Sequence, residues 1–373
     1  MRKKGEAGAA LDKLRVLIAD DTVIYRKILA RAVEETGLAV VERSASNGAI
    51  AMEWLEQGQI DVALLDLFMP EMDGIETLKA IKKKHPSVDA IMISSLSTDN
   101  AQVTLEALKL GALDFIIKPS EASYEKSMDK ISGQLKVLFA QIKITKYNTQ
   151  PRVVHPEKPV AKPPAPANTE NKIIKDAARA ARFTADVVVI ASSTGGPAAL
   201  ENLFAGFLPG FRKPALIVQH MPPEFTRILA DSLDRKYPLK VIEGKEGDPV
   251  RNGQAIIAPG GLHMEVQPSG VDKTVKLSSS PYVNGVRPAA DVLFSSVAKA
   301  YEGRNVLAVV LTGMGNDGTR GVQELKERCN CLCIAQSESS CVVYGMPRCI
   351  IEAGLADEVL DLRDIAGRIQ QLI

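Results

Sequence analysis

Short, nearly continuous apolar runs separated by amphipathic stretches constrain the fold of this chain most. In the first half the runs are "LRVLIAD", "VALLDLF", "AIMISS" and "FIIKP", and in the second they are "DVVVIAS", "ALIVQH", "AIIAP", "VLAVVLTG" and "CLCIAQ". Strands that are apolar on both faces are typical of parallel sheets covered by helices on each side. The pattern predicts an α/β fold with doubly wound parallel sheets, whose functional residues gather at the carboxyl ends of the strands.

A proline-rich stretch divides the two sets of runs. Residues 151–166 contain six of the 21 prolines. Such a stretch forms neither a sheet ladder nor a helix and is typical of a semi-rigid linker. Apolar residues spaced by three and four from Met128 to Ile142 predict a helix just before it. A chain of 373 residues is long enough for two domains. We therefore expect a first domain at 12–140, a linker at 141–183 and a second domain at 184–373.

Composition and charge argue against several classes of protein. The net charge of +1 does not fit an electrostatic nucleic-acid binder, and the second half contains no basic helix-turn-helix. No apolar run approaches the ~20 residues of a membrane-spanning helix. The amino-terminal "MRKKGEAGAALDKLR" lacks the apolar segment of a secretion signal. We expect a cytoplasmic protein with no nucleic-acid partner and no membrane insertion.

The five cysteines fit a reducing compartment. Cys329, Cys331 and Cys333 are spaced by two, which places them on one face of a strand. This is not the CxxC spacing of zinc sites. Because a free cysteine packs as a small apolar side chain, we expect buried thiols here.

Acidic residues follow the apolar runs of the first half. Asp20 and Asp21 come directly after the first run, and Asp66 lies in the second. Carboxylates on neighbouring strand ends repel one another, and such an oxygen-rich cluster suits Mg²⁺. Ser94 and Lys118 end two later runs. A lysine can pair with a carboxylate or a phosphoryl group, and a carboxylate can itself accept a phosphoryl group. The alternative is a salt-bridged cluster without a ligand.

With these residues, the first half resembles a response-regulator receiver domain over 12–140. Phe68, two residues after the central aspartate, stands where that family usually has a polar side chain. The resemblance implies Mg²⁺ as a cofactor for phosphorylation. It also implies roles for six positions: Asp66 as phosphoryl acceptor, Asp20, Asp21 and Asp66 as Mg²⁺ ligands, Ser94 and Lys118 as contacts of the phosphoryl group, and Phe115 as the aromatic switch.

The stretch "VIASSTGGP" leaves a strand through hydroxyls and glycines. It lacks the lysine of GxxxxGK[ST] and is not GxGxxG, so it is a weak phosphate-binding motif. It is not the GxSxG of a nucleophile elbow either. Phosphate binding, a nucleophilic serine and a plain strand-to-helix turn all remain open from this stretch alone.

A nucleophilic serine needs a base and an acid that orients the base. His220 ends the run "ALIVQH", and Asp317 lies in the glycine-rich "LTGMGNDG". Ser193, His220 and Asp317 therefore each follow a predicted parallel strand. Individually, the histidine fits a structural residue and the aspartate fits a helix cap. For His263, in "GGLHMEV", we expect a structural or supporting role, because a triad needs one base.

Six blocks make the second half similar to the catalytic domain of the chemotaxis protein-glutamate methylesterases, the CheB family. They are "SSTGGP", "QHMPPEFT", "IAPGGLHM", "RPAADVLFSSVA", "LTGMGNDG" and "SCVVYGMP", spread over most of residues 185–373. The resemblance implies a Rossmann-like domain with Ser193 as nucleophile, His220 as base and Asp317 as the orienting acid. It adds the Met314 amide as an oxyanion donor. Ala191 stands where the family usually has glycine.

The implied chemistry is acyl transfer to serine. The amides of Thr194 and Gly195, at the start of the following helix, suit an oxyanion. Arg287 is the expected substrate contact, in preference to Asp291, because acidic receptor helices favour a guanidinium. The resemblance implies a phosphorylation-activated hydrolase that removes methyl esters from chemoreceptor glutamates, releases methanol and deamidates receptor glutamines. It implies methyl-accepting chemoreceptors as substrates, a chemotaxis histidine kinase as phosphodonor and no cofactor in the catalytic domain.

One alternative belongs to another functional class. In it the chain is a two-domain regulator whose second domain binds a nucleotide or a phosphorylated partner at the "STGG" loop without hydrolysis. A Ser193→Ala substitution discriminates between the two, because it abolishes turnover of an enzyme but only weakens binding by a regulator.

Overall fold

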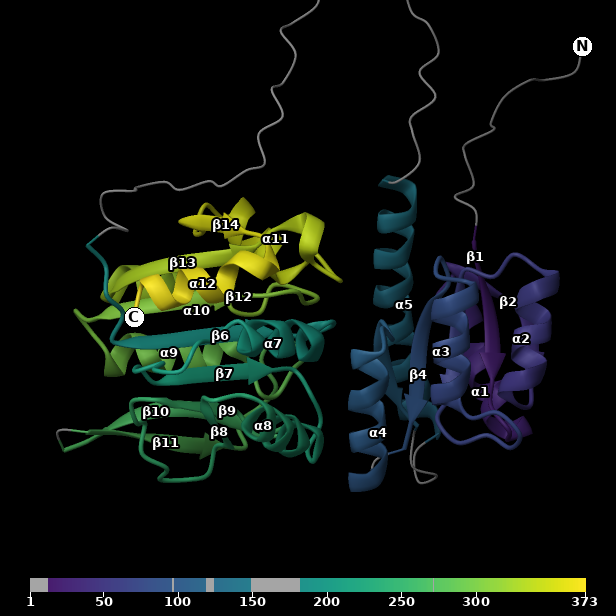
Figure 1. Ribbon diagram of the computed structural model, residues 1–373, viewed down its shortest axis with the longest axis horizontal. Coiled ribbons are helices and arrows are strands. Elements are labelled where there is room, and N and C mark those ends of the chain that lie inside the picture. The colour runs from purple at the N-terminus through teal and green to yellow at the C-terminus, as the bar shows by residue number, and fades with distance from the viewer. Residues whose placement is uncertain (1–12, 96, 119–123, 149–181, 271) are drawn as a thin grey trace, which may run out of the picture. The chain divides into compact units, whose positions relative to one another are not determined.

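Two separate parallel sheets organise the chain, each with its own helices (Figure 1). The computed structural model describes residues 13–95, 97–118, 124–148, 182–270 and 272–373. Two compact units result, one built mainly from residues before 157 and the other mainly from residues after 156. The proline-rich stretch at 151–166 lies outside the described residues.

The first unit contains a five-stranded sheet of order β2-β1-β3-β4-β5, with every neighbouring pair parallel. Alternate residues of β1, β3 and β4 form a core with apolar residues of α1 and α5. The strands are β1 (Leu14–Ala19), β2 (Ala39–Ala45), β3 (Val62–Asp66), β4 (Asp89–Ser94) and β5 (Asp114–Ile117). The helices in this part of the chain are α1 (Val23–Glu35), α2 (Gly48–Gln57), α3 (Gly74–Lys84), α4 (Thr98–Lys109) and α5 (Tyr124–Asn148).

The second unit is built on a seven-stranded parallel sheet of order β14-β13-β12-β6-β7-β9-β8. Its strands are β6 (Val187–Ser192), β7 (Ala215–Gln219), β8 (Lys240–Glu243), β9 (Gln254–Ile257), β12 (Asn305–Val310), β13 (Asn330–Gln336) and β14 (Glu358–Leu360). Its helices are α7 (Gly196–Ala205), α8 (Phe225–Lys236), α9 (Ala290–Ala300), α10 (Thr319–Arg328), α11 (Met346–Glu352) and α12 (Leu362–Gln371), with a 3₁₀ turn at Glu338–Ser340. The prediction of two doubly wound parallel sheets is confirmed.

The apolar runs did not reveal every strand. The edge strand β2 has the sequence "AVVERSA" and is partly exposed, so it forms no continuous apolar run. The strands β8 and β14 also belong to the outer part of their sheet and are short. An antiparallel hairpin of β10 (His263–Ser269) and β11 (Asp272–Ser278) adds a separate two-stranded sheet that the parallel pattern did not predict.

The helix expected before the linker is α5. It continues to Asn148, past residue 140 where we placed the end of the first domain. Its buried residues recur at the predicted spacing, from Met128 through Leu135 to Ile142.

The cysteine prediction is confirmed. Cys331 and Cys333 lie on one face of β13, and both are fully buried in the core that includes α9 and α10. Cys329 ends the preceding helix and is 9% exposed. All five cysteines are free thiols, and burial raises the pKa of Cys329 to about 11. Cys329, Cys331 and Cys333 therefore pack in the core as small side chains.

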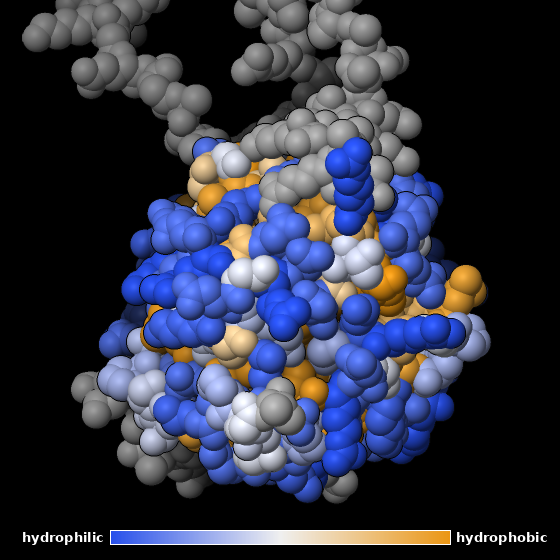
Figure 2. Space-filling model, turned by 90° about the vertical axis from the view of Figure 1, so that its left-hand side faces the viewer, coloured by the Kyte–Doolittle hydropathy of each residue, from blue (hydrophilic) through white to orange (hydrophobic). Residues whose placement is uncertain are grey.

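Among the helices that the structure describes, none has both the length and the apolar character needed to cross a bilayer. Figure 2 shows one face of the second unit, which is mostly hydrophilic, with hydrophobic side chains in small groups between the polar ones.

Candidate functional site

In the first unit, β2 and β3 flank β1, so the order of the strands in the sheet reverses at β1. A crevice at the carboxyl ends of such strands is where doubly wound folds bind ligands. Asp20 and Asp21 follow β1, and Asp66 ends β3, so their carboxylate oxygens lie within 4.8 Å of one another. Asp20 and Asp66 are buried and Asp21 is exposed. Three clustered carboxylates, one of them open to water, fit the oxygen ligands that Mg²⁺ prefers.

Lys118 follows β5 and reaches this cluster. Its Nζ lies 2.8 Å from Asp20 Oδ2 and 2.8 Å from Asp66 Oδ2. Its ammonium is also 4.6 Å from the centre of the Tyr25 ring. Burial lowers the pKa of Lys118, but the hydrogen bonds to both carboxylates outweigh it, so the pKa is raised above its usual value. The side chain therefore stays a cation between the two buried carboxylates.

The carboxyl of Asp66 has an unusually high pKa. Burial raises its pKa to about 6, partly offset by the hydrogen bond from Lys118. The Leu67 amide donates to Asp66 Oδ1 at 2.9 Å. Ser94 ends β4 beside it and is buried, and the Lys118 amide donates to the Ser94 carbonyl at 2.6 Å. The five residues predicted for the receiver site thus come from the ends of four strands at one edge of the sheet.

The two aromatic residues singled out from the sequence lie near the same edge. Phe115 lies on β5 and is half-buried. Phe68 follows β3 and is 55% exposed, so its ring does not belong to the core.

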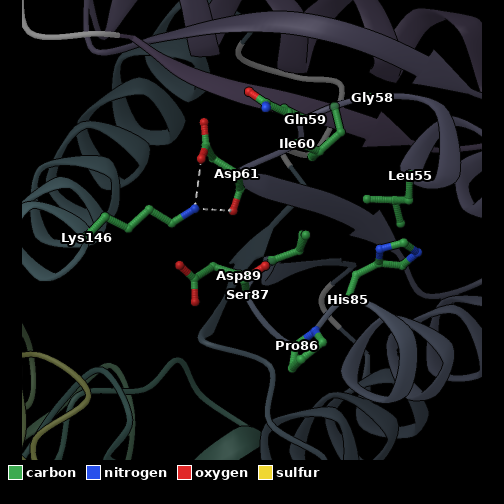
Figure 3. Close-up of a pocket in the computed structure, with 11 residues that line it drawn as sticks. Leu55, Gly58, Gln59, Ile60, Asp61, His85, Pro86, Ser87, Asp89 and Lys146 are labelled. Carbon is green, nitrogen blue, oxygen red and sulfur yellow. Dashed lines mark hydrogen bonds and ion pairs between the residues drawn. The ribbon is translucent and has the colours of Figure 1, made fainter. Parts of the chain in front are cut away.

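A second hollow of the first unit lies at the opposite, amino-terminal end of the strands. Its volume is about 740 Å³, and its lining includes Asp61, Asp89 and His85 (Figure 3). Lys146 Nζ from α5 donates to Asp61 Oδ1 at 2.9 Å and to the Asp61 carbonyl at 3.2 Å. This ion pair ties the end of α5 to the start of β3. The hollow lies away from the aspartate cluster, and Lys146 and Asp61 pair with each other within it.

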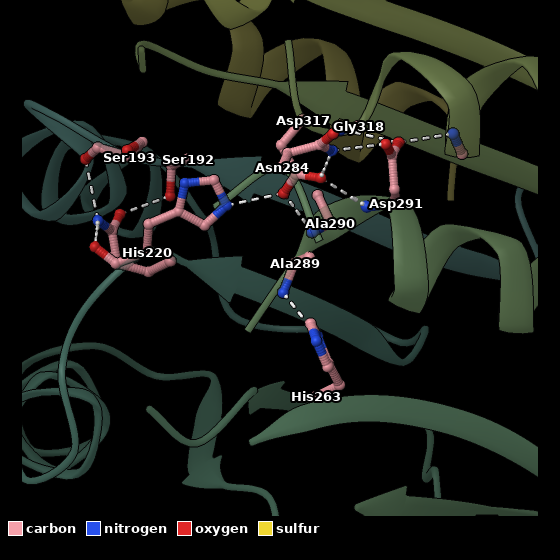
Figure 4. A network of polar contacts seen from close by, with 12 residues as sticks. Ser192, Ser193, His220, His263, Asn284, Ala289, Ala290, Asp291, Asp317 and Gly318 are labelled. Atoms are coloured by element: carbon pink, nitrogen blue, oxygen red, sulfur yellow. Dashed lines mark hydrogen bonds and ion pairs between the residues drawn. The ribbon is translucent and has the colours of Figure 1, made fainter. Parts of the chain in front are cut away.

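In the second unit, β6 lies between β12 and β7, so the order of the strands in the sheet reverses at β6. Ser193 follows β6, His220 follows β7, and Asp317 lies in the loop after β12. The His220 amide donates to the Ser192 carbonyl at 3.1 Å, and the Ser193 amide donates to the Thr312 carbonyl at 3.0 Å. These backbone bonds bring the three loops together at one edge of the sheet (Figure 4).

The imidazole of His220 contacts the carboxylate of Asp317. Nε2 lies 2.8 Å from Oδ2, and the two side chains are 9% and 3% exposed. Burial raises the pKa of Asp317, but the hydrogen bond from His220, with the further donors on this carboxylate, lowers it below its usual value. The ring lies between the Ser192–Ser193 loop and Asp317 (Figure 4). With Nε2 held by the acid, Nδ1 is the nitrogen that can accept a proton.

The start of α9 also stabilises the Asp317 carboxylate. The amides of Ala290 and Asp291 donate to it at 2.5 and 3.1 Å. Amides of a first helical turn carry no intrahelical bond, and the helix dipole favours an anion there. The acid is therefore held as an anion by a helix terminus as well as by the imidazole.

Asp291 makes the reverse contact with α10. Its Oδ1 accepts from the amides of Gly318 and Gly321 at 3.0 and 2.8 Å, at the first turn of that helix. Each of the two acids thus binds the amides that begin the other's helix. Burial, followed by smaller contributions that include the charge of Asp317, raises the pKa of Asp291. The sequence suggested a cap for Asp317 but not this exchange, because the two helices lie apart in the chain.

A buried amide fixes the loops that carry Ser193 and His220. Gln219 Nε2 donates to the carbonyls of Ser193 and His220 at 2.9 and 3.3 Å. Its Oε1 accepts from Ser192 Oγ at 2.7 Å. The hydroxyl of Ser192 is fully buried in this contact, whereas Ser193 is partly exposed. Sequence reasoning missed Gln219, since nothing marks a buried glutamine at a strand end.

Glycines allow a close approach around Ser193. Gly195 precedes α7 with φ 74°, a left-handed conformation that favours glycine. A Cβ on Gly313 would lie 2.8 Å from the Ser193 Cβ and 2.5 Å from Met346 Sδ. The loop that carries Met314 therefore runs directly against the Ser193 loop. Both loops contribute backbone to the same small space.

Arg287 and His263 hold backbone near the site. Arg287 Nη1 donates to the carbonyls of Ser279 and Ser280 at 2.8 and 2.9 Å, and its guanidinium lies 4.5 Å from the Tyr282 ring centre. Its expected contact with substrate stays a prediction. His263 is buried, with Nδ1 3.2 Å from the Ala289 amide, which donates to it, and Nε2 3.1 Å from the Pro281 carbonyl. It supports the start of α9, away from the acid–imidazole contact.

Comparisons with known proteins agree with both halves of this description. The family model described as the response regulator receiver domain matches residues 16–126, and the CheB methylesterase model matches residues 188–369. A protein-glutamate methylesterase/protein-glutamine glutaminase of Desulfotalea psychrophila is 39% identical over 96% of this chain and 98% of its own length. One of the same name from Bdellovibrio bacteriovorus is 40% identical over 95% and 96%. The solved catalytic domain of Thermotoga maritima CheB methylesterase is 39% identical over 51% of this chain and all of its own, with a TM-score of 0.49.

Proposed function

Since this chain belongs to the family of CheB protein-glutamate methylesterases, we propose that it is a phosphorylation-activated carboxylic ester hydrolase of bacterial chemotaxis. It removes methyl groups from glutamate esters of chemoreceptors, releases methanol and deamidates receptor glutamines. Relatives that carry both activities in their name match nearly the whole chain, receiver included. The observation that carries the proposal is the 2.8 Å contact between His220 and Asp317 beside the Ser193 loop.

The proposed reaction proceeds through an acyl-serine. His220 takes the Ser193 hydroxyl proton at Nδ1 while Oγ attacks the ester carbonyl, and Asp317 stabilises the imidazolium. Backbone amides of Thr194, Gly195 and Met314 donate to the oxyanion. The proton then passes to the departing methoxide, which leaves as methanol. Water attacks the acyl-serine by the same proton route and yields a free glutamate. On a primary amide the leaving group is ammonia.

The receiver domain regulates the hydrolase activity through phosphorylation. Asp66 accepts the phosphoryl group from a chemotaxis histidine kinase, and Lys118 and Ser94 contact it. Mg²⁺ held by Asp20, Asp21 and Asp66 would neutralise charge on the phosphoryl oxygens. The three-carboxylate cluster and the shared ammonium of Lys118 support this assignment.

We assign residues 12–148 to the receiver domain, 149–183 to the linker and 184–373 to the catalytic domain; the first boundary moves from the predicted residue 140 because α5 continues to Asn148. Separate cores in the two units support the first and last of these. Arg287 is proposed as a contact for acidic receptor helices. The cytoplasmic location stays a prediction.

The test is methanol release from membranes that contain methylated chemoreceptors, measured with and without a small-molecule phosphodonor. We expect release that rises with the phosphodonor and is lost in Ser193→Ala. If folded wild-type protein releases no methanol under either condition, the hydrolase proposal is wrong. Binding at the "STGG" loop without hydrolysis would then be the better explanation.

A further inference from the structure

A two-residue turn in the second unit presents an amide to the acids of the site. Val283 and Val286 form an antiparallel bridge around Asn284 and Gly285. These two residues have φ 52° and 75°. Positive φ at both central positions is the geometry of a type I′ turn, for which Asn-Gly is the preferred pair. The turn fixes the backbone from which the Asn284 side chain extends.

The side-chain amide of Asn284 joins two carboxylates. Its Nδ2 lies 2.8 Å from Asp291 Oδ2 and 2.8 Å from Asp317 Oδ1 (Figure 4). An amide nitrogen has two hydrogens, so one can point at each acid. Asp317 Oδ2 receives His220, which leaves Oδ1 for this contact. Asn284 thus holds the side of Asp317 that faces away from the imidazole.

The two acids need such a donor. Both are at least nine-tenths buried, and the charge of Asp317 is one cause of the raised pKa of Asp291. Among the described residues, the one ion pair that either acid makes is the contact of Asp317 with His220. A donor that contacts both buried carboxylates lowers the free-energy cost of ionising each of them.

Other charged groups face the pair from one side. A cavity of about 400 Å³ beside Asp291 is lined by residues of β10, α9 and α10. Its charged lining residues are Glu265, Lys299 and Arg320. Arg320 pairs with Glu324 at 3.2 Å and Lys276 lies 4.0 Å from Glu265, so local partners occupy two of these groups.

We propose that Asn284 is a positioning residue for the hydrolysis: by sharing its amide between Asp317 and Asp291, it keeps Asp317 ionised and aimed at His220. The inference rests on the proposed function for its kinetic consequence. Asn284 does not take part in proton transfer itself. It acts through Asp317, and its loss weakens the acid–imidazole contact.

Two substitutions test this without removing the turn. Asn284→Gly deletes the amide, and glycine tolerates the positive φ. Asn284→Asp keeps the size of the side chain and its tolerance of this conformation, but replaces the donor with a third carboxylate. The matched control is Asn252→Gly, at the exposed Asn-Gly turn before β9, which has no contact with the acids. We measure methanol release from methylated chemoreceptors with the full chain. We expect kcat/KM to fall about ten-fold in Asn284→Gly, further in Asn284→Asp, and little in the control.

A second readout does not depend on methyl ester hydrolysis. The chain has four histidines, so ¹⁵N-histidine labelling gives few ring signals, and His220→Gln identifies that of His220. Without the amide, the buried Asp317 is harder to ionise and less well aimed, so it stabilises the protonated His220 ring less. We expect the titration of the His220 ring to move to lower pH in Asn284→Gly and to stay in place in Asn252→Gly.

The outcomes separate the two ideas. If wild-type protein releases no methanol but Asn284→Gly shifts the His220 titration to lower pH, the proposed function fails and the positioning of Asp317 stands. If turnover falls while the titration stays in place, Asn284 is only a structural turn residue and the inference is wrong. A shifted titration with unchanged turnover, in an enzyme that does release methanol, overturns the positioning role as well.

Discussion

Adjacent serines in this chain have different environments. Ser192 is the last residue of β6 and its hydroxyl is committed to Gln219, whereas Ser193 lies in the following loop and is partly exposed. In a strand, successive side chains point to opposite faces, so a one-residue step changes what a hydroxyl can reach. The role of each serine follows from its position relative to the strand end.

This difference predicts unequal effects of two alanine substitutions. We expect Ser193→Ala to lower kcat by at least about 1000-fold, as loss of a triad nucleophile does. Ser192→Ala removes one buried hydrogen bond, at a cost of about 1 kcal/mol in stability, and leaves turnover within about ten-fold. Methanol release and urea unfolding measure the two effects. Loss of turnover in Ser192→Ala with full turnover in Ser193→Ala would reverse the assignment.

At the receiver site, the raised pKa of Asp66 makes stability depend on pH. A carboxyl with a pKa of about 6 in the folded state and about 3.8 in the unfolded state binds its proton more tightly when folded. Its stabilising contribution is complete below the lower value and is lost as the pH rises through the higher one. Asp66→Asn should therefore stabilise the protein by about 1 to 2 kcal/mol at pH 7.5 and little at pH 4.

Urea unfolding in EDTA, which removes divalent cations, measures this difference. The exposed Asp129 of α5 provides the control substitution to asparagine. An equal effect of Asp66→Asn at both pH values would show that burial of the charge is not what destabilises the site.

At the scale of elements, loops at the strand ends are joined by buried amide side chains. Gln219 ends β7 and binds two carbonyls and a hydroxyl. Gln336 ends β13 and does the same for neighbouring loops: its Oε1 accepts from the Thr312 amide at 2.7 Å and its Nε2 donates to the Ser340 carbonyl at 2.6 Å. Strands position the start of each loop, and these amides set the path that the loop takes.

Gln219→Met tests whether the buried amide of Gln219 fixes the Ser193 and His220 loops. Methionine fills a similar volume but leaves the Ser193 and His220 carbonyls without their donor. We expect a loss of about 2 to 3 kcal/mol in unfolding free energy, because buried polar groups lose their partners, together with a lower kcat. Urea unfolding and methanol release measure both. The exposed Gln323 of α10, changed to methionine, is the control; equal stabilities of the two variants would contradict the role of Gln219.

The central strands could be predicted from the sequence, and the buried amide side chains that join the loops could not. Strands β6, β7 and β12 are apolar on both faces, so their runs stand out. Ser193 and His220 directly follow β6 and β7, and Asp317 lies in the loop after β12. The outer strands β2 and β8 mix polar and apolar residues because one side of each is open to solvent. Gln219 and Asn284 look like any other amide in the sequence, since their partners lie far along the chain. The hydrogen bonds from the α10 amides to Asp291 could be found only in the folded structure, because α9 and α10 are brought together by the fold.

For the whole molecule, two hydrophobic cores predict two unfolding transitions. One core joins β1, β3 and β4 with α1 and α5, and the other joins the central strands of the second sheet with α9 and α10. In differential scanning calorimetry we expect Mg²⁺ with beryllofluoride, a phosphoryl mimic, to raise the midpoint of one transition by several degrees, because a ligand stabilises the unit that binds it. Asp66→Ala should abolish that rise. A single transition that moves as a whole would contradict two separately unfolding units.

The place of β6 in its sheet has a consequence for synthesis. This strand is the first of the second unit to leave the ribosome, yet it lies between β7 and β12. Translation at about 5 to 20 residues per second leaves the edge destined for β12 unpaired for several seconds. During that interval the nascent chain exposes an apolar strand edge of the kind that chaperones cover and aggregates exploit. The proposed orienting acid, Asp317, emerges only after β12. Premature termination between β6 and Asp317 should therefore yield an inactive fragment that is prone to aggregation.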